Sequence, residues 1–150
     1  MKKIVICGNY GGSNTGDEAM LEGMLESLRD KAEIIVLSHD PRHTKKHHDV
    51  TSEQGLPLGI RSFWKHNLTG LKRQTMRIFK DADLFILGGG SLFTDEESNR
   101  APSMWAKQAN AAIESNTPLV MFGQTLGPIS DKKSKELVSE IFKKASGIYL

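Results

Sequence analysis

The sequence predicts an α/β fold: a doubly wound, mostly parallel Rossmann-like sheet with helices on both faces. Short apolar runs alternate along the chain with stretches whose apolar residues recur every three or four positions. Three of the apolar runs are followed directly by a glycine-rich segment, a common form of strand-to-helix connection. This alternation favours parallel strands joined by right-handed crossovers. At 150 residues the chain has the size of one domain and can bury a core.

The first half of the chain begins with a strand at residues 4–7. A helix at 17–30 follows, because Met20, Leu21, Met24, Leu25 and Leu28 form one apolar stripe. The second strand is expected at 33–37.

Residues 39–58 are the least periodic part of the chain. They contain four of the five histidines, with Asp40 and Asp49 nearby, so a metal site is conceivable. However, Pro41 argues against one continuous helix, and no cysteine is present in this stretch. We interpret the segment as a solvated basic stretch with a short edge strand at 49–52.

The second half of the chain repeats the alternation of helices and strands. Proline before or within the first turn and small polar caps mark where the helices begin. The predicted elements are a helix from Asn67 to about Lys80, a strand at 82–87, a helix starting near Pro102, a strand at 118–122, a helix capped by Ser130 or Asp131, and a strand from Gly147.

The first glycine-rich segment, GNYGGSNTGDEAML (residues 8–21), does not have the pattern of a nucleotide-binding loop. Its glycines miss the G-x-G-x-x-G spacing, and Asp17 stands where a P-loop needs lysine. Thr15 and Glu18 have the spacing of a capping box. Acids and amides here suit hydroxyl groups better than a pyrophosphate. A tight connection that binds no ligand is an equally good interpretation of this stretch alone.

The predicted strand order 3-2-1-4-5-6 brings all three glycine-rich segments to the carboxyl edge of the sheet. Ligands bind at that edge in open α/β sheets, next to the point where the strand order reverses. Hydroxyl, amide and carboxylate groups there suit a polyol such as a sugar. The residues expected to line this crevice are Asn9, Tyr10, Asn14, Asp17, Ser91, Thr94, Asp95, Gln124 and Thr125.

The composition argues against several other classes of protein. A formal net charge of +2 is too small to indicate binding to nucleic acid or to an anionic membrane. The single cysteine, Cys7, cannot form an internal disulfide, which points to a reducing compartment. The apolar run after Met1 is too short for a signal peptide or a transmembrane segment, so we expect a cytoplasmic protein.

In three segments the chain resembles the polysaccharide pyruvyl transferase family: GNYGGSNTGDEAML (8–21), LGGGSLFTD (87–95) and GQTLGPI (123–129). LSHDP (37–41) is similar to the family's stretch after its second strand. The resemblance implies a two-lobed enzyme of the GT-B type, of which residues 1–150 would be the N-terminal Rossmann-like lobe. A C-terminal lobe is then expected beyond Leu150.

The resemblance also implies a reaction. An enolpyruvyl unit would pass from phosphoenolpyruvate to two hydroxyls of a sugar or lipid-linked oligosaccharide, forming a pyruvate ketal. No cofactor or metal is implied, and the acceptor suggests peripheral proximity to a membrane. The cationic residues that clamp the donor are expected after Gly147 and in the second lobe. We therefore expect residues 1–150 alone to be inactive.

Two carboxylates are the predicted catalytic residues, by resemblance and by their place after predicted strands. Asp95 is the first candidate for partner or base of the acceptor hydroxyl, and Asp17 is the second. The predicted substrate-binding residues are Asn9, Tyr10, Asn14, Gly16, Glu18, Gly89, Gly90, Ser91, Thr94, Gln124, Thr125 and Gly127.

Two other functions fit the sequence. One is the acceptor lobe of a glycosyltransferase that uses a nucleotide-sugar donor, since such enzymes share the two-lobed plan. The other is a non-catalytic Rossmann-like module that binds a sugar or a nucleotide. Titration with phosphoenolpyruvate and with nucleotide sugars would separate these possibilities.

Overall fold

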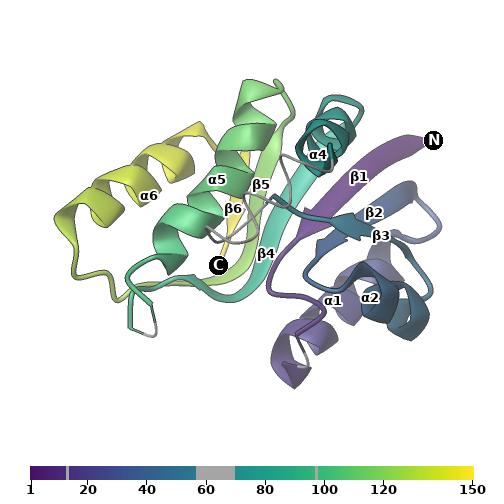
Figure 1. The fold of residues 1–150 in the computed structure, drawn as a ribbon, viewed down its shortest axis with the longest axis horizontal. Helices are drawn as coiled ribbons and strands as arrows, with labels where there is room; N and C mark the ends of the chain where they lie inside the picture. The colour runs from purple at the N-terminus through teal and green to yellow at the C-terminus, as the bar shows by residue number, and fades with distance from the viewer. Residues whose placement is uncertain (13, 57–69, 97) are drawn as a thin grey trace.

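A parallel sheet forms the centre of the molecule. The computed structural model describes all residues except 13, 57–69 and 97. Among the described residues the sheet has six strands in the order β3-β2-β1-β4-β5-β6, and every neighbouring pair is parallel (Figure 1). This confirms the doubly wound Rossmann-like fold and the predicted strand order, with the reversal between β1 and β4.

The elements follow one another in strict alternation, as the sequence predicts. The strands are β1 (Lys2–Cys7), β2 (Ala32–Ser38), β3 (Thr51–Gln54), β4 (Leu84–Phe93), β5 (Leu119–Leu126) and β6 (Gly147–Tyr149). The helices are α1 (Thr15–Leu28), α2 (Pro41–His48), α4 (Leu71–Lys80), α5 (Ala101–Glu114) and α6 (Lys132–Lys144). None of these described helices has both the length and the apolar character needed to cross a bilayer.

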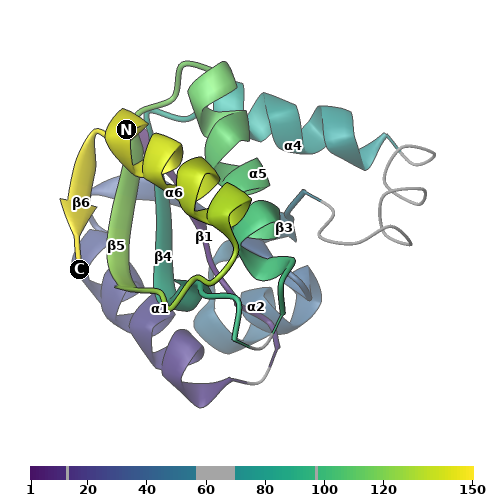
Figure 2. The same ribbon diagram turned by 90° about the vertical axis from the view of Figure 1, so that its left-hand side faces the viewer.

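The helices lie on both faces of the sheet. Figures 1 and 2 show α1 and α2 together on one side, while α5 and α6 pack beside each other on the other. Alternate side chains of β1 serve the two faces: Val5 joins the core that includes α5, whereas Ile4 and Ile6 join the core that includes α1. A strand buried on both faces reads as a continuous apolar run, which is why the sequence shows β1 so clearly.

The glycine-rich segments after β4 and β5 differ from the prediction. Both strands continue through their glycines, to Phe93 and Leu126, instead of ending at residues 87 and 122. Gly88 pairs with Phe122 and Gly90 with Gln124, and the register shifts between Gly90 and Phe93. Glycine has a weak strand preference of its own, but pairing with a neighbouring strand outweighs it. These stretches are therefore strand extensions, not turns.

The stretch predicted to be an irregular basic segment contains α2. Pro41 begins this helix, a position where its missing N–H has no helical partner to lose. The Asp40 carboxylate caps the helix by accepting from the backbone N–H of Arg42 (3.0 Å) and His43 (3.1 Å). The prediction of a solvated segment is wrong for His48, whose exposed fraction is only 3%.

The caps of the other helices correct one prediction, confirm one and leave one untested. The side chain of Asn14, not Thr15, caps α1, by accepting from the Gly16 N–H at 3.1 Å. Gly70 precedes α4, while the predicted cap Asn67 lies outside the described residues. Asp131 caps α6 as predicted. Its carboxylate accepts a hydrogen bond from the Ser134 N–H, and this bond lowers the pKa of the Asp131 carboxyl group.

Candidate functional site

An open crevice of about 580 Å³ lies at the carboxyl edge of the sheet, where β1 and β4 separate. We call it the strand-edge crevice. Its position agrees with the general rule for ligand sites in open α/β sheets. Its lining residues come from the ends of β1, β2 and β4 and from the first turns of α1 and α5: Asn9, Asn14, Asp17, His39, Gly90, Ser91, Leu92, Thr94, Glu96, Ser98, Ala101, Met104 and Trp105.

The structure brings part of the predicted site together in this crevice. The predicted residues that line it are Asn9, Asn14, Asp17, Gly90, Ser91 and Thr94. The predicted residues that are not among its lining are Tyr10, Gly16, Glu18, Gly89, Asp95, Gln124, Thr125 and Gly127. The crevice is thus built by the first and second glycine-rich segments, without the third.

Asp17 is the buried carboxylate of the crevice. It lies in the first turn of α1, and only 5% of its surface is exposed. The Asn9 amide donates to its Oδ2 at 3.0 Å. Its Oδ1 lies against Gly90, which has a φ of +80° and where a side-chain carbon would collide with that oxygen. Burial raises the pKa of Asp17, and the hydrogen bond from Asn9 partly opposes this shift.

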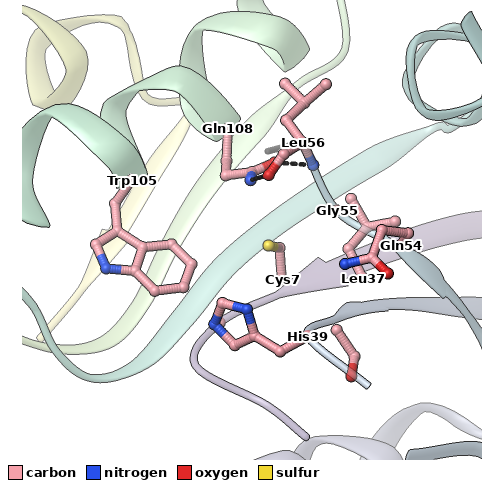
Figure 3. A pocket seen from close by; sticks show the side chains of 10 residues that line it. Cys7, Leu37, His39, Gln54, Gly55, Leu56, Trp105 and Gln108 are labelled. Carbon is pink, nitrogen blue, oxygen red and sulfur yellow. Dashed lines mark hydrogen bonds between the residues drawn. The ribbon is translucent and has the colours of Figure 1, made fainter. Parts of the chain in front are cut away.

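His39 is the second titratable group that faces the crevice, and the sequence prediction missed it as a site residue. It follows the last residue of β2, and its ring stands edge-on to that of Trp105, with 6.3 Å between the centroids (Figure 3). Burial lowers the pKa of His39, so its ring is neutral at neutral pH. A neutral imidazole has one nitrogen free to accept a proton. The signal in the sequence was its place directly after a strand.

Trp105 is held in place by the helix that carries it. One turn further along α5, the Gln108 amide bonds to both backbone groups of Leu56: it donates to the carbonyl at 3.0 Å and accepts from the N–H at 3.3 Å (Figure 3). This pair ties α5 to the chain just after β3. Trp105, His39 and Cys7 line a small pocket of about 20 Å³, which is room for about one water molecule (Figure 3).

Tyr10 and Glu18 were predicted to bind substrate, but both are occupied within the protein. Tyr10 is fully buried, and its hydroxyl donates to the Gly88 carbonyl at 2.6 Å. Glu18 accepts from the Gly11 N–H at 2.8 Å and contacts His48 with its other oxygen. Buried polar groups need such partners, and here β4, residue Gly11 and α2 supply them. Their role in this structure is to hold that segment against β4 and α1.

Asp95, the first candidate for catalysis, also has internal partners. Its Oδ2 accepts from the backbone N–H groups of Ser130 (2.6 Å) and Asp131 (3.0 Å), at the entry to α6. The hydroxyl of the preceding residue, Thr94, donates to the Pro128 carbonyl at 3.0 Å. Orphan N–H groups before a helix need an acceptor, and Asp95 provides it. Asp95 thus holds the third glycine-rich segment through Oδ2, and its role toward an acceptor hydroxyl stays a prediction.

Gln124 is buried beside β4, with an exposed fraction of 4%. Its amide nitrogen donates to the Leu87 carbonyl at 2.6 Å, so it is directed at a neighbouring strand. Thr125 is exposed and also lies outside the crevice lining. These two residues share the predicted rim with Asn14 and Asp95 but do not face the same space.

The charge of the crevice lining limits what can bind there. The described lining has two carboxylates, Asp17 and Glu96, and contains no lysine or arginine. A multiply charged anion would lack a cationic partner on these residues, whereas a neutral polyol would find hydroxyl, amide and carboxylate groups. Among the described residues, no group of three or more histidine, cysteine, aspartate or glutamate side chains is placed to hold a metal ion.

Two comparisons with known proteins bear on this chain. The family model of polysaccharide pyruvyl transferases matches residues 14–150. Among solved structures, the chain is similar to the crystal structure of the TrkA-N domain of the inner membrane protein ybaL from Escherichia coli, with 11% identity and a TM-score of 0.46. That similarity covers 99% of this chain and 87% of the other. The family match covers both segments that build the crevice, apart from residues 8–13.

Proposed function

The chain belongs to the polysaccharide pyruvyl transferase family, and we propose that its strand-edge crevice binds the sugar acceptor of a pyruvyl transfer. The donor in this proposal is phosphoenolpyruvate, and the product is a pyruvate ketal on a polysaccharide precursor. The observation that supports this most directly is the lining of the crevice. Its described residues combine hydroxyl and amide groups with two carboxylates and one imidazole, and include no lysine or arginine.

The reaction requires two protons to move. Two sugar hydroxyls add to the central carbon of phosphoenolpyruvate, whose carbon–oxygen bond to the phosphate breaks. Of the two hydroxyl protons, one ends on the methylene carbon, which becomes a methyl group, and the other leaves with the phosphate. Asp17 and His39 face the crevice and can carry these protons. The pKa of Asp17 is raised and the pKa of His39 is lowered, so the two values lie closer together than in free side chains.

We assign to His39 the acceptance of the proton from the attacking hydroxyl, because its neutral ring keeps a free nitrogen. In the same assignment, Asp17 accepts a hydrogen bond from an acceptor hydroxyl and carries the second of the two hydroxyl protons. The Asn9 amide orients the Asp17 carboxylate, leaving Oδ1 beside Gly90 at the crevice. Ser91 and Asn14 supply further hydrogen bonds to the sugar.

The donor needs groups that the described crevice lacks. The carboxylate and phosphate of phosphoenolpyruvate call for cations and amide donors, and the lining residues provide no cation. In our proposal a second lobe of a GT-B-like enzyme supplies them, so residues 1–150 alone do not catalyse the transfer. The chemistry involves no redox step and needs no cofactor. We place it in the cytoplasm, near the membrane that bears lipid-linked precursors.

The test uses the full-length natural protein with phosphoenolpyruvate and a set of lipid-linked oligosaccharides. The expected result is release of phosphate together with an acceptor that gains one pyruvate less one water. Asp17→Asn and His39→Asn should each lower turnover by about a hundredfold or more. Glu26→Gln and His43→Asn, which alter exposed residues on α1 and α2, are the matched controls. Transfer from a nucleotide sugar instead of phosphoenolpyruvate would contradict the proposal.

A further inference from the structure

His48 is the buried histidine of α2, and both of its ring nitrogens contact carboxylates of α1. Nε2 lies 2.7 Å from Oε2 of Glu18, and Nδ1 lies 2.6 Å from Oε2 of Glu22. A carboxylate can only accept, so each nitrogen must donate. A neutral imidazole has one N–H and cannot satisfy both contacts. An imidazolium, which carries an N–H on both nitrogens, would satisfy both contacts at once.

The charges around His48 balance one another. The groups that face it are Glu18, Glu22 and Arg29 of α1 and the neighbouring His47 of α2. Arg29 donates to the His48 carbonyl at 2.6 Å and pairs with Glu22 at 3.3 Å. The His47 ring stands edge-on at 4.8 Å. With His48 protonated, two cations would face two carboxylates, which is the arrangement that permits buried charge.

The contact continues from His48 to the glycine-rich segment at residues 8–12. The second oxygen of Glu18, Oε1, accepts from the Gly11 N–H at 2.8 Å. Gly11 has a φ of +78° and lies against Ser38 and Asp40, where a side chain would not fit. The same segment is joined to β2 by the His39 N–H, which donates to the Tyr10 carbonyl at 3.0 Å.

This network reaches both proton carriers of the proposed reaction. Glu18 is the neighbour of Asp17 in the first turn of α1, and the Tyr10 carbonyl receives the backbone N–H of His39. A shift of residues 8–12 would move Asn9 as well, and Asn9 holds the Asp17 carboxylate. A displacement of about 1 Å at such groups is enough to slow a reaction about a hundredfold.

We infer that His48 is a positioning residue: as an imidazolium between Glu18 and Glu22, it fixes the glycine-rich segment on which Asp17 and His39 depend. The effect on catalysis rests on the proposed function, but the structural link does not. Among the described residues His48 is not part of the crevice lining, so its effect on the crevice passes through Glu18. Its loss should loosen Gly11 first and the reacting groups second.

The first experiment measures the network without any substrate. Nitrogen-15 spectra of the protein at neutral pH should show both ring nitrogens of His48 protonated. In His48→Gln, where a single amide can reach only one carboxylate, hydrogen exchange at the Gly11 amide should become faster by about tenfold or more. Lys45→Gln, which alters an exposed residue on the same helix, should leave that exchange unchanged. A neutral His48 ring, or unchanged exchange at Gly11 in folded His48→Gln, overturns the inference.

The wild-type protein provides a second test should His48→Gln fail to fold. The Gly11 amide signal should shift with pH at the same midpoint as the His48 ring, and independent midpoints overturn the inference. Activity forms a separate arm, in which His48→Gln should lower kcat for pyruvyl transfer by about tenfold or more, and Lys45→Gln should not. If Gly11 responds but no variant or wild-type enzyme transfers pyruvate, the proposed function fails and the positioning role stands. If Gly11 responds and transfer is unaffected, the catalytic part of the inference is wrong.

Discussion

The side-chain amide of Asn9 donates to Oδ2 of Asp17 at 3.0 Å, across the glycine-rich segment that separates them in the chain. The contact joins the end of β1 to the first turn of α1. Burial raises the pKa of Asp17, and this one hydrogen bond works in the opposite direction. The carboxylate is thereby oriented by one neighbour while its other oxygen remains at the crevice beside Gly90.

Asp17→Asn should stabilise the protein at neutral pH while it lowers turnover. The folded pKa of Asp17 lies above its ordinary value of 3.8, so folding favours the protonated form. Its contribution to stability is therefore greatest below pH 3.8 and declines as the pH rises through the folded pKa. Asparagine resembles the protonated acid and can still accept from Asn9. Melting temperatures at pH 3.5 and pH 7.5 should show a gain for the variant at the higher pH only.

The control for this prediction is Glu26→Gln, an exposed carboxylate on the same helix. Its melting temperature should follow that of the wild type at both values of pH. A lower melting temperature for Asp17→Asn at pH 7.5 would show that the charged form of Asp17 stabilises the fold. Such a result would contradict the raised pKa.

Gly90→Ala should damage both the fold and the site. A φ of +80° costs an alanine about 1–2 kcal/mol, and its methyl group would meet Oδ1 of Asp17. The free energy of unfolding should fall by at least that amount, and turnover should fall with it. Gly23→Ala is the matched control, because Gly23 lies in α1 with open space around its Cα. It should raise the free energy of unfolding by about 0.5–1 kcal/mol. Chemical denaturation measures both, and equal stability of the two variants would contradict the strain at Gly90.

The fold could be predicted from the sequence because its signals are local. Alternating apolar runs and helical stripes predict parallel strands, and β1 and β4 are buried on both faces, which makes them unmistakable. The ends of β4 and β5 could not be predicted, because Gly88 and Gly90 are strand residues only through their pairing with β5, which is distant in the sequence. Helix α2 could not be predicted either. Its polar sequence forms a helix because Asp40 caps it and because His48 contacts carboxylates of α1.

The site could be predicted in part, for a similar reason. Asn9 and Asn14 lie between β1 and α1, and Asp17 lies in the first turn of α1, so their place at the edge of the sheet follows from topology. The sequence does not show which polar residues face the crevice. Glu18 and its neighbour Asp17 are both carboxylates, yet Glu18 contacts Gly11 and His48 instead of the crevice. His39 lies in the stretch predicted to be solvated, and it is exposed. Its contact with Trp105 could not be predicted, because Trp105 comes from a helix more than sixty positions away.

Cys7 should be unreactive in the folded protein. It lies in β1 with an exposed fraction of 3%, and burial raises the pKa of its thiol to about 12. The thiolate, which is the reactive form, is then nearly absent at neutral pH. A thiol reagent such as DTNB should label the native protein only on the timescale of unfolding, and label it at once in denaturant. Labelling of the native chain within seconds would show that the small pocket lined by His39 and Trp105 admits the reagent.

Two substitutions of Asp95 separate a positioning role from catalysis. Asp95→Asn keeps an oxygen that can accept from the N–H groups of Ser130 and Asp131, so we expect turnover of the full-length enzyme within a few-fold of wild type. Asp95→Ala removes the acceptor and should lower the free energy of unfolding by about 1–3 kcal/mol, since two N–H groups lose their partner. Denaturation curves and steady-state rates on the same samples distinguish the two roles. A loss of about a hundredfold in turnover for Asp95→Asn, at unchanged stability, would show that Asp95 takes part in the reaction. Asparagine has the shape of aspartate but cannot exchange a proton, so such a loss would come from the missing acidity.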